Sequence, residues 1–148
     1  MRYPFYKYLF YLQMAYNITL EGKNLVQAEK LLSNVITIFE SCQVAYWLEG
    51  GTLLGLRREG RLLPWDNDLD ISIHDSEFGK LSLLTRTLKK KVYRVRTRVF
   101  EKDSAIFKKG DLRMIKIRTK LFFGLVQGNV CLDFFIKYYK DKNKYWEI

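Results

Sequence analysis

Cysteine, proline and histidine are scarce in this chain. Its 148 residues include two cysteines, two prolines and a single histidine. Two cysteines are too few for a disulfide framework or a structural zinc site of their own, and Cys42 and Cys131 are expected to be buried thiols rather than a bridge. The lone His74 has no paired ligand and supports no mechanism by itself.

Long apolar runs are also missing. The most apolar stretch near the start, residues 8–20, has 13 residues, is interrupted by Gln13 and Asn17, and shows no clear signal-peptide cleavage pattern. It is too short and too polar to cross a bilayer. With no internal repeat, low-complexity tract or linker, residues 1–148 are expected to form one domain. Apolar residues make up 48% and charged residues 28% of the chain, which excludes disordered and fibrous proteins.

The net charge is +10, and it is distributed unevenly. Residues 1–79 carry 7 basic and 10 acidic side chains, a net of −3, whereas residues 80–148 carry 19 basic and 6 acidic ones, a net of +13. A basic half of this kind is typical of nucleic-acid binding, but nucleotides and sugar phosphates explain it equally well. Five acids lie within twelve residues, at Asp66, Asp68, Asp70, Asp75 and Glu77.

The pattern of apolar residues predicts an α+β domain. Apolar side chains recur every three or four positions from Leu25 to Phe39, which predicts an amphipathic helix. The expected strands cover residues 43–48, which are expected to be buried, and residues 68–73, 92–100, 114–118 and 130–136. A helix is expected over 53–58, capped by Thr52 and ended by Gly60. A further helix, capped by Asp75 or Ser76, is expected to run to about residue 91.

Two glycines and two aspartates predict a phosphate and metal site. A strand that turns directly into a helix at Gly50 and Gly51 leaves backbone N–H groups pointing outward, and glycine lets a phosphate approach them without a Cβ in the way. Asp68 and Asp70 lie two apart on a strand, so their carboxylates share one face. Two close carboxylates repel unless a cation lies between them, and hard oxygen ligands favour Mg²⁺ or Mn²⁺. A phosphate-binding turn beside metal-binding carboxylates is typical of enzymes that transfer phosphoryl or nucleotidyl groups.

A third carboxylate is expected on a neighbouring strand, and Asp133 is the candidate. It is the charged residue within an otherwise apolar run, residues 130–136, where burial without a partner is costly. A metal ion or a nearby cation would account for it, and an ion pair with one of the many arginines is the plainer alternative. Each feature alone has a plainer explanation, because Gly-Gly is usually a simple turn and alternate acids usually mark a solvated strand face. Their combination favours the metal site.

The stretch from Trp47 to Ile73 resembles the LicD/fukutin-type branch of the nucleotidyltransferase-fold superfamily. The first part of the family motif, W-L-x-G-G-(S/T)-x-L-G, is matched from Trp47 to Gly55. The second part, R-x-G-x-x-x-P-W-D-x-D-x-D, is matched by Arg58, Gly60, Pro64, Trp65, Asp66, Asp68 and Asp70. Its R-x-G and P-W segment is specific to this branch, and Asp133 falls where the family carries an aspartate in a later strand.

The resemblance implies a mixed β-sheet flanked by helices and a transferase that depends on Mg²⁺ or Mn²⁺. Family members move a phospho-alcohol, such as phosphocholine or a polyol phosphate, from a CDP-activated donor to a glycan hydroxyl, for example on lipopolysaccharide or teichoic acid. The implied metal ligands are Asp66, Asp68, Asp70 and Asp133, of which Asp66 either binds metal or only orients its loop. The implied phosphate cradle is Gly50, Gly51 and Thr52. The implied phosphate-binding cations are Arg57, Arg58 and Arg61, for which a solvated helix end is the alternative. One carboxylate is expected to activate the acceptor hydroxyl.

The sequence departs from the family pattern in two ways that matter. Asn67 stands where many members carry an acid, although that position alternates to the other strand face. The chain also ends at Ile148, soon after Asp133, whereas members generally continue, so a truncated, a minimal or an inactive form of the domain is expected.

Three functions therefore stay open. They are phosphotransfer with a CDP-alcohol donor and an anionic or phosphorylated glycan acceptor, nucleotidyl transfer to RNA or a small molecule on the same fold, and a non-catalytic relative. No nucleic-acid partner is expected under the first. Bacterial relatives work in the cytoplasm and eukaryotic ones in the secretory pathway, and the sequence does not choose between these compartments.

A second basic feature follows the acid strand. Arg94, Arg96 and Arg98 fall on one face of a predicted strand, after a run of lysines at residues 89–91. They are expected to bind an acidic polymer or the phosphates of a nucleotide. The alternative is a charged edge strand that resists aggregation.

Overall fold

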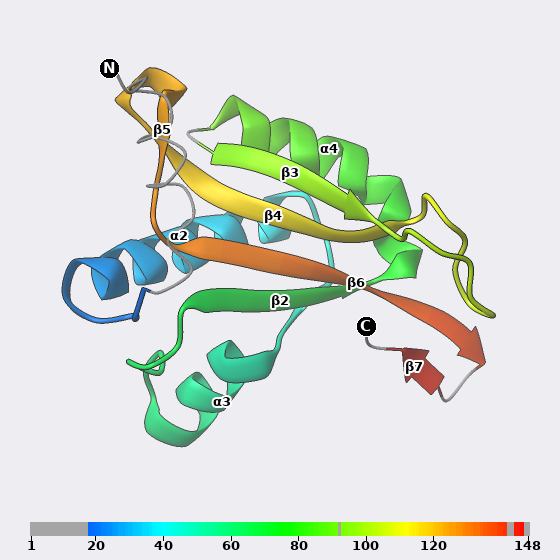
Figure 1. Cartoon of the computed structure of the whole chain (residues 1–148), viewed down its shortest axis with the longest axis horizontal. Coiled ribbons are helices and arrows are strands. Elements are labelled where there is room, and N and C mark those ends of the chain that lie inside the picture. Colours follow the sequence, from blue (N-terminus) through cyan, green and yellow to red (C-terminus); the bar gives the residue numbers. More distant parts are fainter. Residues whose placement is uncertain (1–17, 92, 142–143, 147–148) are drawn as a thin grey trace, which may run out of the picture.

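The structure, a computed structural model, describes residues 18–91, 93–141 and 144–146 (Figure 1). The helices are α2 (Gly22–Ser41), α3 (Gly50–Glu59) and α4 (Phe78–Lys90), and the 3-10 turns are η1 (Asp75–Glu77) and η2 (Phe122–Gly124). The strands are β1 (Trp47–Leu48), β2 (Asp68–His74), β3 (Tyr93–Val99), β4 (Leu112–Leu121), β5 (Val126–Gln127), β6 (Cys131–Asp141) and β7 (Lys144–Trp146).

These strands form one mixed sheet flanked by helices, as expected from the sequence. Its order is β1-β2-β6-β4-β3, with β5 paired to β4 and β7 paired to β6. β2 and β6 run parallel, and the other described pairs are antiparallel. Parallel neighbours need a long crossover, and here α4, β3 and β4 provide it. The expected α+β class is therefore confirmed.

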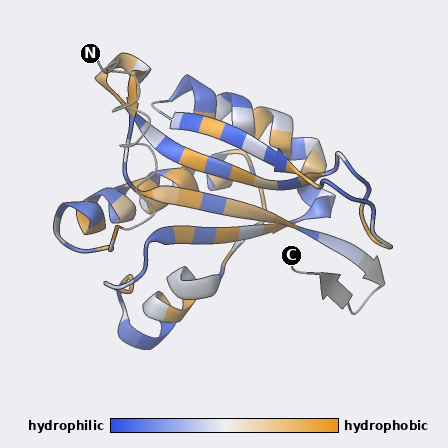
Figure 2. Ribbon diagram, viewed as in Figure 1, coloured by the Kyte–Doolittle hydropathy of each residue, from blue (hydrophilic) through white to orange (hydrophobic). Residues whose placement is uncertain are grey.

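The two long helices pack against the same face of the sheet (Figure 1). Because side chains alternate across a strand, β2 turns Leu69, Ile71 and Ile73 toward the helices, and all three are fully buried. The rings of Phe39 on α2 and Phe134 on β6 meet edge to face at 5.4 Å. Figure 2 shows the same alternation of hydrophilic and hydrophobic residues along β3 and β4. The polar residues of the strands therefore gather on the opposite face.

The first expected strand is much shorter than predicted. Residues 43–48 contain only the two residues of β1, which pair antiparallel with β2 at the edge of the sheet. Gln43 has a positive φ of 53°, which breaks an extended chain. The backbone N–H of Ala45 donates to the Glu77 carboxylate at 3.1 Å rather than to a strand partner. Trp47 is partly exposed, so the prediction of a buried strand is wrong.

Two predicted helix caps are also wrong. Thr52 lies inside the first turn of α3, whose N-cap is Glu49, and the Thr52 hydroxyl accepts a hydrogen bond from the backbone N–H of Asp70 at 2.9 Å. The segment after β2 begins with the turn η1, in which Nδ1 of His74 accepts from the backbone N–H of Ser76 at 3.1 Å. Neither Asp75 nor Ser76 is the cap. Gly60 does end α3, in the left-handed conformation at φ 67°.

Other expectations are confirmed. Cys42 and Cys131 are free, buried thiols. β3 lies at the edge of the sheet as far as the described strands show, which fits a charged edge strand at Arg94, Arg96 and Arg98. The apolar stretch over residues 8–20, which was expected to be too short to cross a bilayer, lies mostly outside the described residues. Within the described part of the chain, no helix is both long enough and apolar enough to cross a membrane.

Candidate functional site

The glycine turn at the start of α3 lies directly against two carboxylates. Gly50 has φ 54°, a conformation that favours glycine, and a Cβ there would lie 2.6 Å from Oδ2 of Asp70. A Cβ on Gly51 would collide with the carboxylate of Asp66. Side chains at either position would therefore push the acids away. The two features that the sequence singled out separately, the glycines and the acid cluster, face one another in the structure.

Thr52 and Glu49 fix this turn onto the sheet. Thr52 is buried and accepts from the Asp70 backbone, as described above. The backbone N–H of Glu49 donates to the carbonyl oxygen of Asp70 at 3.1 Å. The first N–H groups of α3 have no partner within the helix, because the preceding turn needed to accept them does not exist. The turn is thus held rigidly with its amides beside the carboxylates of β2.

The parallel pairing of β2 and β6 brings the third carboxylate alongside. Asp70 and Asp133 are partners in register, and Asp68 is the partner of Cys131. Neighbouring strands lie about 4.8 Å apart, so the acids occupy adjacent positions on the polar face. Asp133 is 5% exposed, and Asp68 and Asp70 are half-buried. The structure therefore places Asp133 on the strand next to the acid pair, where the sequence expected a third carboxylate.

Burial and accumulated negative charge raise the pKa values of Asp68 and Asp70. Burial, followed by the charges of Asp68, Asp133, Asp66 and Glu49, raises the pKa of Asp70 to about 7. Burial and the charges of Asp133 and Asp66 also raise the pKa of Asp68, against the opposing effect of Lys116 and Arg118. The site thus holds more carboxylate charge than the nearby cations neutralise. A bound cation would relieve it.

The sequence did not single out Lys116, which compensates Asp133. Nζ of Lys116 on β4 forms an ion pair with Oδ2 of Asp133. The Cys131 thiol donates to Oδ1 of Asp133 at 2.9 Å, and burial together with that carboxylate raises the pKa of the thiol to about 12. A nearby cation was one of the expected partners of Asp133, and it is a lysine rather than one of the arginines considered as the plainer alternative. The signal was present, because Lys116 is a charged residue between the apolar Ile115 and Ile117 on a predicted strand.

The four predicted metal ligands are close in the fold but do not converge on one point. Among the described residues, no group of three or more His, Cys, Asp or Glu side chains is arranged to hold a metal ion. One oxygen of Asp133 is engaged by Lys116, and Oδ1 of Asp66 accepts from the backbone N–H of Asn67 at 2.9 Å. Asp68 and Asp70 remain as two hard-oxygen donors on one strand face, which suits Mg²⁺ or Mn²⁺.

Cations continue the row of acids across the sheet. The register aligns Asp70, Asp133, Lys116 and Arg96 on four successive strands. Arg94 and Arg118 are cross-strand partners on the same face, next to that row. Arg96 and Arg98 are exposed, whereas Val95, which lies between Arg94 and Arg96, packs against the core. The polar face therefore has an acidic half on β2 and β6 and a basic half on β4 and β3.

The structure does not bring the arginines after the glycine turn into this site. Arg57 and Arg58 lie in the last turn of α3, at the opposite end from Gly50. Seven residues of helix separate them by about 10 Å. Arg58 and Arg61 pair with Glu59 at 2.7 and 3.0 Å, and these hydrogen bonds hold the pKa of Glu59 below its usual range. Phosphate binding by Arg57, Arg58 and Arg61 stays a prediction.

A buried ion pair that sequence reasoning missed supports the turn from the other side. Lys137 on β6 has a side chain only 6% exposed, and its Nζ lies 2.9 Å from Oε1 of Glu49. The other Glu49 oxygen accepts from the Ser72 hydroxyl on β2. Removing one partner of such a pair leaves an uncompensated buried charge. Glu49, Ser72 and Lys137 thereby tie the start of α3 to both parallel strands.

A mixed sheet with a glycine turn facing strand carboxylates defines a nucleotidyltransferase-like fold. Comparison with known protein families supports this fold and identifies one family within it. The sequence pattern of the family described as LicD/FKTN/FKRP, nucleotidyltransferase domain, matches residues 43–147. The chain belongs to this LicD family.

Named relatives agree with that assignment over parts of the chain. The human ribitol 5-phosphate transferase FKRP is 44% identical over 50 residues, which is 34% of this chain and 10% of FKRP. The lipopolysaccharide cholinephosphotransferase LicD of Haemophilus influenzae is 34% identical over 63 residues, 43% of this chain and 23% of that protein. The chain thus spans a small part of these relatives. The crystal structure of ANT(2")-Ia with adenylyl-2"-tobramycin aligns over 78% of this chain and 52% of its own, with a TM-score of 0.46 and 16% identity.

Asp70→Asn is expected to stabilise the metal-free chain at pH 8. Folding raises the pKa of Asp70 from 3.8 to about 7, so the native state binds this proton more tightly than the unfolded state. Stability should fall as pH rises from about 4 to about 7, and the ionised carboxylate is a net cost above that range. Asparagine removes the cost. In EDTA at pH 8, the melting temperature of Asp70→Asn should therefore exceed that of the wild type, by about 2–4 °C for each kcal/mol gained in the free energy of unfolding. Near pH 4 the two melting temperatures should match.

Glu29→Gln, at an exposed acid on α2, provides the matched control and should leave the pH dependence of melting unchanged. Equal melting temperatures of Asp70→Asn and the wild type at pH 8 would show that the carboxylates are not crowded as described.

Proposed function

We propose that this chain transfers a phospho-alcohol, such as phosphocholine or a polyol phosphate, from a CDP-activated donor to a glycan hydroxyl with the help of Mg²⁺ or Mn²⁺. The observation that carries the proposal is the contact of Gly50 and Gly51 with the carboxylates of Asp70 and Asp66. The named relatives support it, because one is a ribitol 5-phosphate transferase and the other a lipopolysaccharide cholinephosphotransferase.

The residues of the site divide the work between two halves. The free N–H groups of the glycine turn bind phosphate oxygens of the donor, since a helix start favours anions. Asp68 and Asp70 are the proposed metal ligands, with Asp66 and Asp133 at the border of the site. A divalent cation held there would neutralise charge on the phosphoryl group. One of the carboxylates accepts the proton of the attacking hydroxyl.

The basic half positions the negative charge of the substrates. Lys116 and Arg118 lie on β4, next to the acids, and Arg94 and Arg96 lie one strand further on β3. Three strand spacings separate Arg96 from Asp70, about 14 Å, which is the length of a short anionic glycan. We propose that the exposed Arg96 and Arg98 bind the anionic acceptor. Acceptor binding would then account for the excess of positive charge in residues 80–148.

Asp68→Asn and Asp70→Asn are expected to lower the rate of CMP release from a CDP-alcohol by about a hundredfold or more, because each removes a proposed ligand of the cation that would neutralise the phosphoryl group. The assay uses Mg²⁺, a panel of CDP-alcohols and a glycan acceptor, with folding checked by circular dichroism. Glu29→Gln should retain full activity.

Unchanged turnover in both aspartate variants would overturn the proposal. Nucleotidyl transfer, which the family's domain description also allows, is tested in the same panel by adding nucleoside triphosphates with RNA. Incorporation of a nucleotide without CMP release would favour that second function.

Arg96→Gln is expected to raise KM for an anionic acceptor and to leave kcat unchanged, because it removes binding charge remote from the reacting atoms. The exposed Arg86 on α4, in the helical layer on the other face of the sheet, is the matched control. A fall in kcat for Arg96→Gln, or equal effects of the two substitutions, would contradict the assignment of this arginine to the acceptor.

A further inference from the structure

The turn between β4 and β5 presents a cluster of exposed apolar side chains, which we call the apolar tip (residues 121–125). Phe123 is fully exposed, and Leu125 and Phe122 are 78% and 73% exposed. Leu121 at the base is 39% exposed. Single exposed apolar residues need no explanation, whereas adjacent ones that include two phenylalanines indicate an interaction surface.

The backbone of the tip adopts a costly conformation that favours this display. Phe122 and Phe123 have φ values of 48° and 57°, and Gly124 follows at 89°. Bulky residues seldom adopt the left-handed region, and such strain concentrates at functional positions. Two consecutive phenylalanines in this region are not explained by packing, because neither is buried.

Cations surround the tip. The Arg94 guanidinium donates to the carbonyl oxygen of Gly124 at 2.9 Å, and that of Arg118 donates to Asn129 at 2.6 Å, so both arginines are fixed at the base of the turn. Lys120 directly precedes the tip. The other two basic residues of β4 are not part of this group, because Arg113 lies at the opposite end of the strand and Lys116 pairs with Asp133.

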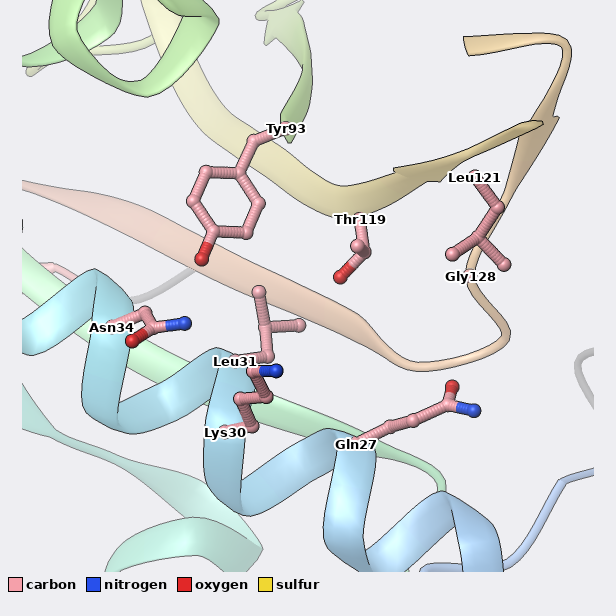
Figure 3. Close-up of a pocket in the computed structure, with 8 residues that line it drawn as sticks. All are labelled: Gln27, Lys30, Leu31, Asn34, Tyr93, Thr119, Leu121 and Gly128. Atoms are coloured by element: carbon pink, nitrogen blue, oxygen red, sulfur yellow. The ribbon is translucent and has the colours of Figure 1, made fainter. Parts of the chain in front are cut away.

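A cavity of about 250 Å³ lies between the base of the tip and α2 (Figure 3). Leu121 belongs to both the tip and the cavity wall, and Leu31 and Tyr93 add apolar surface to the cavity. Lys30 of α2 also lines it and adds a further cation beside the tip. The apolar surface thus continues from the exposed rings into the body of the protein.

We propose that the apolar tip inserts into the interfacial layer of an anionic lipid bilayer, with Arg94, Arg118, Lys120 and Lys30 against the lipid headgroups. Exposed apolar and aromatic side chains next to basic ones are typical of protein surfaces that bind the membrane interface. The tip is a projecting turn at the end of the sheet (Figure 1), and the basic side chains at its base, Arg94, Arg118 and Lys120, match an anionic surface. The acidic start of β2 lies two strands away from β4, on the far side of β6. The proposal does not depend on the proposed function.

Co-sedimentation with lipid vesicles tests the proposal. The wild type should bind vesicles of phosphatidylcholine mixed equally with phosphatidylglycerol and bind pure phosphatidylcholine much less. The double variant Phe122→Ser and Phe123→Ser should lose about tenfold or more in affinity for the mixed vesicles, since two large apolar groups no longer leave water. Lys120→Glu should weaken binding at low salt. Leu83→Ser removes an exposed apolar side chain from α4 and should have no effect.

A second readout locates the insertion. Because both native cysteines are buried, Phe123→Cys can be labelled selectively with a polarity-sensitive fluorophore, and its emission should shift to the blue with mixed vesicles, whereas a label on Leu83→Cys should not shift. The absence of vesicle binding, equal binding to pure phosphatidylcholine, or full binding by the double variant would each overturn the proposal. A dimer that the double variant converts to a monomer would assign the tip to a second copy of the chain instead, which also overturns it.

Discussion

The in-register parallel pairing of β2 with β6 is the constraint on which the site depends. It places Asp133 beside Asp70 although 62 positions of sequence separate them, and α4, β3 and β4 form the crossover between the two strands. The same crossover puts β4 next to β6, which brings Lys116 to Asp133. One topological choice therefore sets the positions of the acids and of the cation that compensates one of them.

The glycine turn completes the site by bringing a helix start against crowded negative charge. The hydroxyl of Thr52 and the pair formed by Glu49 and Lys137 hold the turn in place. Burial and the neighbouring carboxylates raise the pKa of Asp70 to about 7, so its ionised form is a cost to the metal-free chain at neutral pH. Natural sites tolerate such a cost where a ligand offsets it. The crowding of carboxylates that makes the site unstable alone is also what would give it affinity for a cation.

Much of the fold and part of the site could be predicted from the sequence. The period-two pattern placed Asp68 and Asp70 on one face of β2, and burial cost pointed to a partner for Asp133. The identity of that partner could not be read locally, because Lys116 reaches Asp133 only through the register of β4 against β6. The buried pair of Glu49 and Lys137 is hidden for the same reason. Thr52 was misassigned as a cap because its hydroxyl serves a distant strand, and β1 was overestimated because Gln43 turns the chain. Local patterns find elements, whereas contacts between distant strands require the topology.

Binding of Mn²⁺, followed by the electron paramagnetic resonance signal of the free ion, tests whether the carboxylates beside the glycine turn hold a divalent cation. The wild-type chain should bind Mn²⁺, Mg²⁺ should displace it, and Asp70→Asn should lose this binding while remaining folded. Binding of Mn²⁺ by Asp70→Asn as tight as by the wild type, or no binding by the wild type at all, would contradict the claim that the crowded carboxylates beside the glycine turn form a divalent-cation site.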